Sequence, residues 1–379
     1  MIQGMDDLAA DGAVTYHYGR FPPESLDYAA LIKPLARASA ALARYDQMLK
    51  NMHNSQILLA PLRRQEAVVS SRIEGTVSTL DEVLRYEADQ EGDDGHDDAR
   101  YRSEAIEVFL YSRALRQAQN SLEDGAPLSK WLIRSAHKVL LGFGRGAQLS
   151  PGEFKKEQNY LVDRTKKKIM FIPISPEQLE SGLDTLFGYI ESDPSEELIK
   201  TAIAHLEFEA LHPFKDGNGR IGRMLITLML WKSSLISAPH FYISGYFEKN
   251  RDDYIDKMRA VSGSDEWTSW ILFFLDALEQ QAQENLLIAE QIRTLYEEMK
   301  DRFRLTLSSQ WSTTALDFVF SRPIFRNNVF TSKSGIPSPT AQRFTRALVD
   351  AGLLQTLESP AGRRSGLYAF EPLLSLVRA

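Results

Sequence analysis

One stretch of the sequence concentrates residues that bind phosphate and move protons. Residues 212–223 read His-Pro-Phe-Lys-Asp-Gly-Asn-Gly-Arg-Ile-Gly-Arg. Gly217 and Gly219, on either side of Asn218, can adopt positive φ angles that let consecutive backbone N–H groups converge on one point. A helix that begins near Gly219 adds the partial positive charge of its N-terminus. The stretch therefore predicts an anion-binding nest.

The side chains around this nest have complementary chemistry. Arg220 and Arg223, three positions apart on the first turns of the helix, can grip phosphate oxygens in bidentate fashion. Asp216 beside a polyphosphate would hold a magnesium ion, and His212 can take a proton near neutral pH. The alternative is a tight helix–helix turn with His212 in the core, but seven compatible residues within twelve positions favour phosphoryl or nucleotidyl transfer from a nucleoside triphosphate.

Composition narrows the remaining chemistry. The chain has 379 residues, which predicts two or three domains, and it contains no cysteine. The absence of cysteine excludes disulfide frameworks, zinc fingers, iron–sulfur clusters and thiol nucleophiles. The chain has seven histidines that could act as a base. No run reaches the roughly 18 to 20 apolar residues of a membrane span, and no secretory signal is visible at the N-terminus. We expect a cytoplasmic protein without a membrane partner.

The charge is distributed unevenly along the chain. The net charge of −7 argues against a general nucleic-acid binder. Residues 310–379, however, carry eight basic and four acidic side chains, a net charge of +4, which leaves −11 for residues 1–309. This asymmetry indicates a C-terminal region with a different role.

The elements that must position the nest are mostly helices. Apolar residues recurring every three or four positions predict amphipathic helices, and the nearly all-apolar run 220–233 predicts a central buried helix. Strand-like runs at 158–162 and 169–172 flank a polar tip at 163–168 and predict a hairpin. The acidic stretch 87–98 is interpreted as a solvated loop, because its carboxylates do not follow calcium-loop spacing. Further helices are expected at 27–50, 56–73, 78–85, 101–118, 129–141, 176–191 and 195–211.

The C-terminal region follows a long helix, predicted at 277–303, that joins two domains. In the last of its own helices Pro339 occupies the first helical position, Ser338 precedes it as N-cap and Gly352 follows the end. Three helices and a basic hairpin are the layout of a winged helix-turn-helix domain. The helices are expected at 313–320, 327–332 and 339–351, and the strands at 353–357 and 366–370.

Residues 212–223 resemble the Fic motif, His-x-Phe-x-(Asp/Glu)-Gly-Asn-Gly-Arg-x-x-Arg, at every fixed position. The resemblance implies a mainly α-helical Fic core with a short β-hairpin flap, which transfers AMP from ATP to a Ser, Thr or Tyr hydroxyl of a target protein. It implies His212 as the general base, Asp216 as the Mg²⁺ ligand and Phe214 as a core anchor. It assigns the α- and β-phosphates to Gly217, Asn218 and Gly219, with Arg220 in support, and the γ-phosphate to Arg223.

Residues 70–75, Ser-Ser-Arg-Ile-Glu-Gly, resemble the inhibitory motif (Ser/Thr)-x-x-x-Glu-(Gly/Asn) of the Fic subclass whose inhibitory helix precedes the core. Ser70 and Glu74 are four positions apart, on one helical face. The resemblance implies a salt bridge from Glu74 to Arg223 that leaves ATP bound but misaligned. Taken alone, Glu74 would be an ordinary surface carboxylate; the Fic motif downstream favours the inhibitory role.

Two further segments resemble parts of the family that contact ligands. The predicted hairpin corresponds to the flap, which pairs with the target's backbone by strand addition. In the preceding segment, lysines such as Lys155 and Lys156 stand where an arginine is expected, which leaves the target class open. Residues 246–254 resemble the stretch that borders the adenine and ribose. Asn250 is the candidate nucleotide contact there, with helix packing as the alternative.

The C-terminal region has two interpretations. As a DNA-binding module it would expose Gln342, Arg343 and Arg346 on the recognition helix and place Arg363 and Arg364 of the wing against phosphate. As a protein-contact module it would recruit a target. A net charge of +4 is modest for an independent DNA binder, so both interpretations stay open.

Together these features predict a protein adenylyltransferase restrained by its own Glu74, with ATP as substrate and Mg²⁺ as cofactor. The rival reactions at the same site are removal of AMP, with Glu74 orienting a water, and use of another donor such as UTP or CDP-choline. A DNA-binding regulator with a vestigial Fic core is the rival of another class. Candidate partners are an unidentified target protein, the chain itself as target, DNA, and a second copy in a homodimer.

The resemblance also divides the sequence into contiguous parts. Residues 1–120 are expected to form an N-terminal helical domain with the inhibitory helix, and residues 121–276 the Fic catalytic domain. Residues 277–308 are the linker helix, and residues 309–379 the winged helix-turn-helix domain.

Overall fold

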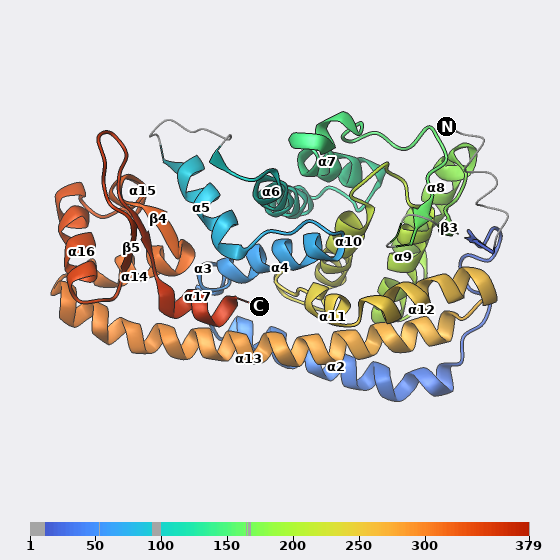
Figure 1. The fold of residues 1–379 in the computed structure, drawn as a ribbon. Helices are drawn as coiled ribbons and strands as arrows, with labels where there is room; N and C mark the ends of the chain where they lie inside the picture. The colour runs from blue at the N-terminus through green and yellow to red at the C-terminus, as the bar shows by residue number, and fades with distance from the viewer. Residues whose placement is uncertain (1–11, 53, 93–99, 164, 166–167, 379) are drawn as a thin grey trace. The chain divides into compact units, whose positions relative to one another are not determined.

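The computed structural model describes residues 12–52, 54–92, 100–163, 165 and 168–378, and most of them lie in helices (Figure 1). The chain packs into two compact units, and each unit is built from two separate stretches of sequence. The first unit comprises Met1–Ala43 and Arg113–Ala282, and the second comprises Arg44–Ser112 and Gln283–Ala379. α2, α6 and α13 each contribute residues to both units, so the units do not follow the contiguous domains expected from the sequence, and those domain boundaries stay a prediction. None of the helices in the described residues combines the length and the hydropathy that a membrane span requires.

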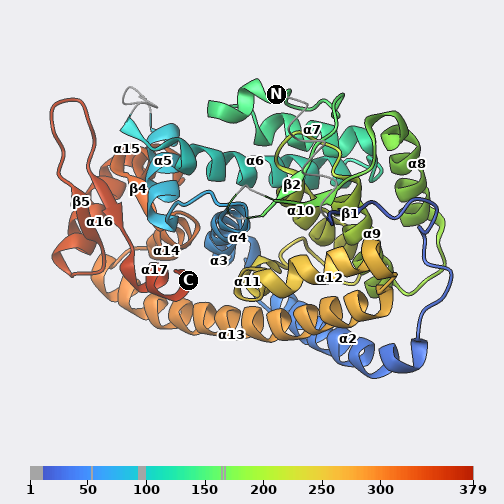
Figure 2. The ribbon, with the colours of Figure 1, turned by 45° about the vertical axis from the view of Figure 1, so that its right-hand side comes forward.

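The first unit is organised around two consecutive helices, α9 (Glu197–Leu211) and α10 (Asn218–Lys232), which pack against each other (Figure 2). The predicted central helix is confirmed, since α10 is buried from Asn218 to Leu230. Gly222 permits the close approach, because a Cβ there would lie 2.3 Å from the Glu209 carboxylate and 3.1 Å from the Phe208 ring. The other helices of this unit are α7 (Lys130–Leu140), the 3₁₀ helix η2 (Gly144–Gln148), α8 (Pro176–Ser192), α11 (Ser244–Lys249) and α12 (Arg251–Ser264).

A small sheet completes the first unit. The predicted hairpin is confirmed: β2 (Leu161–Val162) pairs antiparallel with β3 (Ile169–Ile172). A third strand, β1 (Val14–Thr15), pairs in parallel with β3 and was not foreseen. A strand of two residues is too short to show a periodic pattern in the sequence. The segment is held in place just after β1, where the buried ring of His17 contacts Glu207 and Ser262 at 2.8 Å each.

Three long helices each begin in one unit and end in the other. They are α2 (Tyr28–Lys50), α6 (Ser103–Glu123) and α13 (Trp267–Leu307). The linker helix is longer than expected, because α13 begins ten residues before position 277, where Trp267 and Trp270 are buried in the first unit. The sequence pattern there is apolar without a clear stripe, which hides the helical period.

The second unit joins sequence-distant helices. The single helix expected at 56–73 is two helices, α3 (Ser55–Leu58) and α4 (Ala60–Ile73). Pro61 lies in the first turn of α4, where a proline is tolerated, and it could not lie in the interior of one continuous helix. Both pack against α14 (Ser312–Ser321), and α4 also packs against α17 (Glu371–Val377), which was not predicted. The remaining elements are α5 (Leu80–Glu91), β4 (Ile324–Arg326), α15 (Asn327–Lys333), α16 (Ser338–Asp350), β5 (Gln355–Glu358) and β6 (Leu367–Ala369).

The C-terminal part contains the three helices and the hairpin expected from the sequence, here α14, α15, α16 and β5–β6. β4 adds a third strand, so the antiparallel sheet has the order β4-β6-β5. Its identity as a winged helix-turn-helix domain stays a prediction.

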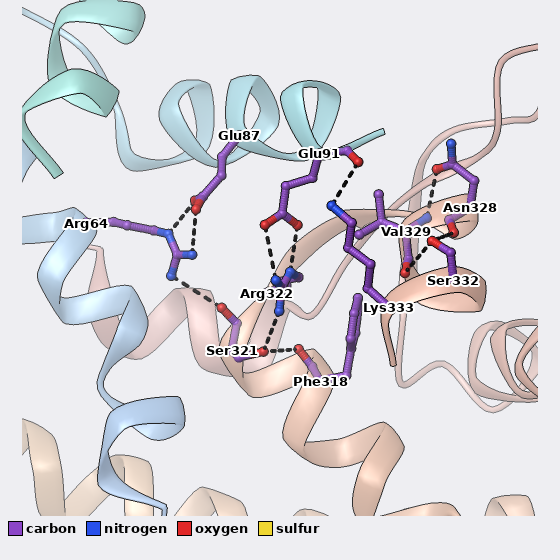
Figure 3. Close-up of polar contacts among 10 residues, drawn as sticks. All are labelled: Arg64, Glu87, Glu91, Phe318, Ser321, Arg322, Asn328, Val329, Ser332 and Lys333. Carbon is purple, nitrogen blue, oxygen red and sulfur yellow. Dashed lines mark hydrogen bonds and ion pairs between the residues drawn. The ribbon is translucent and has the colours of Figure 1, made fainter. Parts of the chain in front are cut away.

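The interpretation of residues 87–98 as a solvated loop is wrong for the part that the structure describes; residues 93–99 lie outside it. Glu87, Asp89 and Glu91 belong to α5, which begins with a capping box between Thr79 and Glu82. Their carboxylates pair with arginines that the local sequence cannot reveal. Glu87 pairs with Arg64 and Glu91 with Arg322 (Figure 3), and Asp89 pairs with Arg326 and Arg364.

The pair between Asp89 and Arg326 fastens α5 to β4. Arg326 is 1% exposed, and its Nε lies 2.6 Å from Asp89 Oδ1. Burial alone would raise the pKa of Asp89, but hydrogen bonds from Arg326 and Tyr101 and the charges of Arg326 and Arg364 outweigh it, so the pKa is lower than the usual 3.8.

We therefore expect Asp89→Asn to lower the free energy of unfolding by about 3 kcal/mol at pH 7, the low end for breaking a buried pair, because Glu358 still contacts Arg326. Because the pKa of Asp89 is depressed in the folded state, the difference between wild type and variant should be complete above about pH 4 and disappear as pH falls through the folded-state pKa. Urea unfolding followed by circular dichroism measures both.

The matched control is Asp301→Asn, which breaks an exposed pair with Arg304 and should change the free energy of unfolding by less than about 0.5 kcal/mol. Equal effects of the two substitutions would contradict the structural importance of the Asp89 pair.

Candidate functional site

The candidate site lies in the turn from α9 to α10. His212 caps the C-terminal end of α9 in the left-handed region, at φ 47° and ψ 61°. Gly217 precedes α10 with φ 77°, which a glycine adopts without strain. The next residues, Asn218, Gly219 and Arg220, form the first turn of α10 and are buried. Of the two glycines expected at positive φ, Gly217 is left-handed, whereas Gly219 is part of the α10 helix. The turn therefore has one left-handed glycine directly before a helix N-terminus, and a nest that binds an anion stays a prediction.

Asn218 braces the turn from inside. Its Oδ1 accepts from Phe214 N–H at 2.8 Å, and its Nδ2 donates to Phe214 O at 2.8 Å. Phe214 is fully buried and stacks on the ring of His137 at 3.8 Å, with the rings 8° from parallel. The interpretation of Phe214 as a core anchor is confirmed.

His137 of α7 connects the turn to a second loop. Gly152 N–H donates to His137 Nδ1 at 2.8 Å, so in the neutral ring the proton is on Nε2, which donates to Asp216 O at 3.0 Å. Burial lowers the pKa of His137 to about 4, and although the bond to Asp216 acts against this shift, the charge of Arg220 adds to it. His137 is therefore a neutral structural histidine at physiological pH.

The charged residues of the turn are close to one another. Arg220 is 1% exposed, and its Nη2 lies 3.7 Å from Asp216 Oδ1. Its Nε and Nη1 have no hydrogen-bond partner among the described residues. Arg223 is also buried, one turn further along α10. Two buried guanidinium groups behind a helix N-terminus, one with unused donors, form an environment that suits an anion.

His205 is a core histidine, as expected. Its ring contacts Gly222 O at 3.1 Å and Tyr254 Oη at 2.8 Å, and burial together with the charge of Arg223 lowers its pKa to about 3. His212, by contrast, is partly exposed, with Nδ1 3.3 Å from Glu209 O.

Asn250 lies at the junction of α11 and α12, where its Nδ2 donates to Tyr246 O at 3.0 Å. A shallow hollow of about 280 Å³ is lined by residues 248–253. The contact with Tyr246 agrees with the helix-packing alternative, so a nucleotide contact of Asn250 stays a prediction.

The two residues of the inhibitory motif occupy the end of α4. Ser70 is fully buried in the last turn, whereas Glu74 is the exposed C-cap residue, followed by Gly75 at φ 88°. Both belong to the second unit, whereas His212 and Arg223 belong to the first. A salt bridge between Glu74 and Arg223 stays a prediction.

The candidate DNA-binding residues fall into two groups. Gln342, Arg343 and Arg346 are exposed on α16, and Arg363 is exposed in the loop between β5 and β6. Arg364 is half-buried and pairs with Asp89 at 2.8 Å and with Glu358 at 3.5 Å. Its guanidinium is therefore already partnered inside the protein.

Sequence reasoning missed two residues that contact the turn. Lys155 and Asn159 come from the segment before the flap and hydrogen-bond to the backbone on both sides of His212. A signal was available: a lysine stood where an arginine was expected, in a segment that otherwise resembled the family.

Two segments of the chain match known protein families. Residues 32–120 match the family described as Fic/DOC family N-terminal, and residues 127–230 match the Fic/DOC family. A probable protein adenylyltransferase of Aquifex aeolicus is 25% identical over 201 residues, which are 53% of this chain and 55% of that protein. The protein adenylyltransferase fic-1 of Caenorhabditis elegans is 33% identical over 66 residues, 17% of this chain and 13% of that protein. The chain thus spans about half the length of the first of these relatives and less of the other.

Solved structures show the same fold. A Fic family protein from Desulfovibrio desulfuricans superposes with a TM-score of 0.57 at 18% identity, covering 92% of this chain and 98% of that one. Fic-1 from C. elegans superposes with a TM-score of 0.51 at 19% identity, covering 68% of this chain and 73% of that one. With both family segments matched and the motif residues assembled in one turn, the chain belongs to the Fic/DOC family.

Proposed function

We propose that the protein is an adenylyltransferase that moves AMP from ATP to a Ser, Thr or Tyr hydroxyl of a protein, in the cytoplasm. The observation that carries the proposal is the turn from α9 to α10. It combines a helix N-terminus after a left-handed glycine, a buried Arg220 with unused donors, and the imidazole of His212. The relatives named protein adenylyltransferase support the same chemistry.

In this mechanism the nest and the arginines hold the triphosphate. Backbone N–H groups of Gly217, Asn218 and Gly219 bind the α- and β-phosphates, with Arg220 behind them, and Arg223 grips the γ-phosphate. In this structure the Gly217 N–H donates to Asp216 Oδ1 at 2.7 Å, so nucleotide binding exchanges that partner for a phosphate oxygen. Asp216 is a single carboxylate beside the phosphates, which suits Mg²⁺, because this ion takes its other ligands from phosphate oxygens and water. When bound, the ion would neutralise phosphate charge.

His212 then acts on the acceptor. It removes the proton of the incoming hydroxyl, whose oxygen forms a bond to the α-phosphorus while the bond from that phosphorus to the bridging oxygen breaks. Pyrophosphate leaves, and AMP remains on the acceptor side chain. Fixed donors around the phosphates stabilise the charge that develops, with no reorganisation during the step.

Glu74 restrains this reaction in the proposal. Its carboxylate pairs with Arg223 and takes the place of the γ-phosphate, so ATP binds in a misaligned position. An exposed glutamate at the end of a helix can reach a partner without unfolding that helix. Two rival reactions use the same residues: hydrolytic removal of AMP with Glu74 orienting the water, and transfer from another nucleotide such as UTP or CDP-choline.

We expect Glu74→Gln to raise AMP transfer at least tenfold, within the 5- to 150-fold range of typical coupling between sites, because it removes the charge that competes with the γ-phosphate. His212→Ala in the Glu74→Gln protein should lower transfer by about 10²- to 10⁴-fold, the usual contribution of a general base. The measurement is incorporation of α-labelled ATP with Mg²⁺ into the protein itself and into added lysate proteins.

Glu298→Gln, an exposed glutamate of α13, is the matched control and should leave transfer unchanged. Unlabelled UTP and CDP-choline as competitors test the donor, and release of AMP from prelabelled protein tests the reverse reaction. The proposal fails if the Glu74→Gln protein transfers nothing from ATP, or if transfer survives His212→Ala.

A second candidate function, DNA contact through α16, is favoured by the exposure of Gln342, Arg343, Arg346 and Arg363. We expect Arg343→Ala to weaken binding to duplex DNA and to reduce the slope of log affinity against log salt by about 1 if it contacts one phosphate. Fluorescence anisotropy at several salt concentrations measures this. Arg304→Ala is the control, and salt-independent or undetectable binding by the full chain favours the protein-contact alternative.

A further inference from the structure

The backbone around His212 is held by one short segment of the chain. Each of the four carbonyl oxygens of residues 211–214 accepts a hydrogen bond from Lys155 or Asn159. Lys155 Nζ donates to Leu211 O at 3.1 Å, Lys155 N to Pro213 O at 2.8 Å, and Asn159 Nδ2 to His212 O and Phe214 O at 3.1 Å each.

The two side chains form a linked pair. Lys155 Nζ also donates to Asn159 Oδ1 at 2.8 Å, which orients the amide so that its Nδ2 points to the turn. Lys155 is 4% exposed, and burial lowers its pKa to about 7. Burying a lysine is costly unless its nitrogen is hydrogen-bonded, and here its bonds go to the turn and to the residue that braces it.

The turn has a conformation that needs such support. A non-glycine residue in the left-handed region costs on the order of 1–2 kcal/mol, and His212 is in that region. Without donors for its flanking carbonyls, the turn could relax toward an ordinary right-handed or extended backbone, and the imidazole would move. A displacement of about 1 Å can lower a reaction rate by 10²-fold.

We propose that Lys155 and Asn159 are positioning residues, which fix the His212 backbone so that the imidazole is presented to the acceptor hydroxyl. The inference rests on the general-base role of His212 in the proposed function. Neither residue needs to touch the nucleotide, so the predicted effect is on the transfer step and not on ATP binding.

The test uses Lys155→Met and Asn159→Asp in the Glu74→Gln protein. Methionine keeps the length of the side chain and removes the Nζ donor, and aspartate keeps the shape of Asn159 and replaces the donating Nδ2 by an acceptor. We expect each substitution to lower the single-turnover rate of AMP transfer at saturating ATP by about 10- to 100-fold, with the ATP dissociation constant changed by less than about twofold. Lys155→Arg, which keeps donors, should recover most of the rate.

Lys156→Met is the matched control, because this neighbouring lysine has an 82% exposed side chain and pairs with Glu153. Thermal unfolding by circular dichroism identifies variants that fail to fold. If Lys155→Met fails to fold, Asn159→Asp still tests the inference, because the aspartate provides a charge partner for Lys155. Rates equal to those of Lys156→Met, or ATP affinity that falls in parallel with the rate, overturn the inference. A Glu74→Gln parent without any transfer overturns the proposed function instead.

A separate observation concerns the helix that carries Glu74. α4 is packed by the C-terminal segment, residues 312–378, through α14 and α17. Arg64 of α4 donates from Nη1 to Ser321 O at 3.3 Å and pairs with Glu87 of α5, with Nη2 2.8 Å from Oε1 (Figure 3). Arg64 is thus bound to α5 and to the C-terminal segment at the same time.

The C-terminal segment is in turn fastened to α5 by charge. Arg322 makes a two-pronged pair with Glu91, at 2.7 and 3.1 Å, and Lys333 Nζ donates to Glu91 O at 3.2 Å (Figure 3). Arg326 and Arg364 share Asp89, as described above. We call these pairs between α5 and the C-terminal segment the α5 clamp.

We infer that the α5 clamp fixes α4 within the second unit and so influences the strength of inhibition by Glu74, an inference that rests on the inhibitory role of Glu74 in the proposed function. Release of the clamp would let α4 shift with the C-terminal segment. Any partner of the C-terminal segment that competes for its arginines would then raise transfer.

Charge reversal tests the clamp. Arg322→Glu should raise AMP transfer by about fivefold or more in the protein with Glu74, within the range of typical coupling between sites, and should have no effect in the Glu74→Gln protein, where inhibition is already lifted. Adding Glu91→Arg to Arg322→Glu restores the pair with reversed charges and should restore inhibition. The milder Arg322→Gln serves if the reversed variant does not fold.

Arg304→Glu, at an exposed pair with Asp301, is the control for added negative charge. The inference is overturned if Arg322→Glu leaves transfer unchanged while Glu74→Gln raises it, or if Arg322→Glu raises transfer equally in both backgrounds. No increase from Glu74→Gln overturns the inhibitory role itself and the clamp inference with it.

Discussion

The site depends on one backbone constraint: His212 must stay in a left-handed conformation between two buried helices. The carbonyl groups of Leu211, His212 and Pro213 receive their donors from Lys155 and Asn159, and Asn159 shares the Phe214 carbonyl with Asn218. Asn218 and His137 hold the following residues in the same way. The backbone that carries His212 and leads into α10 is therefore held by hydrogen bonds from side chains of neighbouring segments.

In the second unit, ion pairs use much of the positive charge of the C-terminal region. The C-terminal region has a net charge of +4, which is modest for a DNA-binding module. In the structure, Arg322, Arg326, Arg364 and Arg378 pair with carboxylates, among them Glu91, Asp89 and Asp81 of α5. Part of the positive charge is therefore neutralised inside the protein, and the exposed basic residues are fewer than the composition indicates.

Much of the fold was predictable because its signals are local. The buried helix α10, the hairpin β2–β3 and the caps around α16 each follow from periodicity or from residue types at fixed offsets. The errors also have physical reasons. β1 and β4 are short strands that exist only as partners of longer-range pairing. The break before α4 reflects Pro61, which is tolerated in the first turn of a helix and not in its interior. The acidic end of α5 was assigned to a loop because the arginines that pair with Asp89 and Glu91 are more than 200 residues away in the sequence.

Residue types alone pointed to the chemistry proposed for this protein. Residues 212–223 supply glycines, two arginines, a carboxylate and an imidazole within one short stretch, and glycine permits the left-handed conformation that Gly217 adopts. The tertiary structure decided what holds that turn and what neutralises the basic C-terminal region. Both depend on contacts between segments far apart in the chain, Lys155 with Leu211 and Asp89 with Arg326, and such pairs have no signature in a single sequence because their spacing is set by the fold.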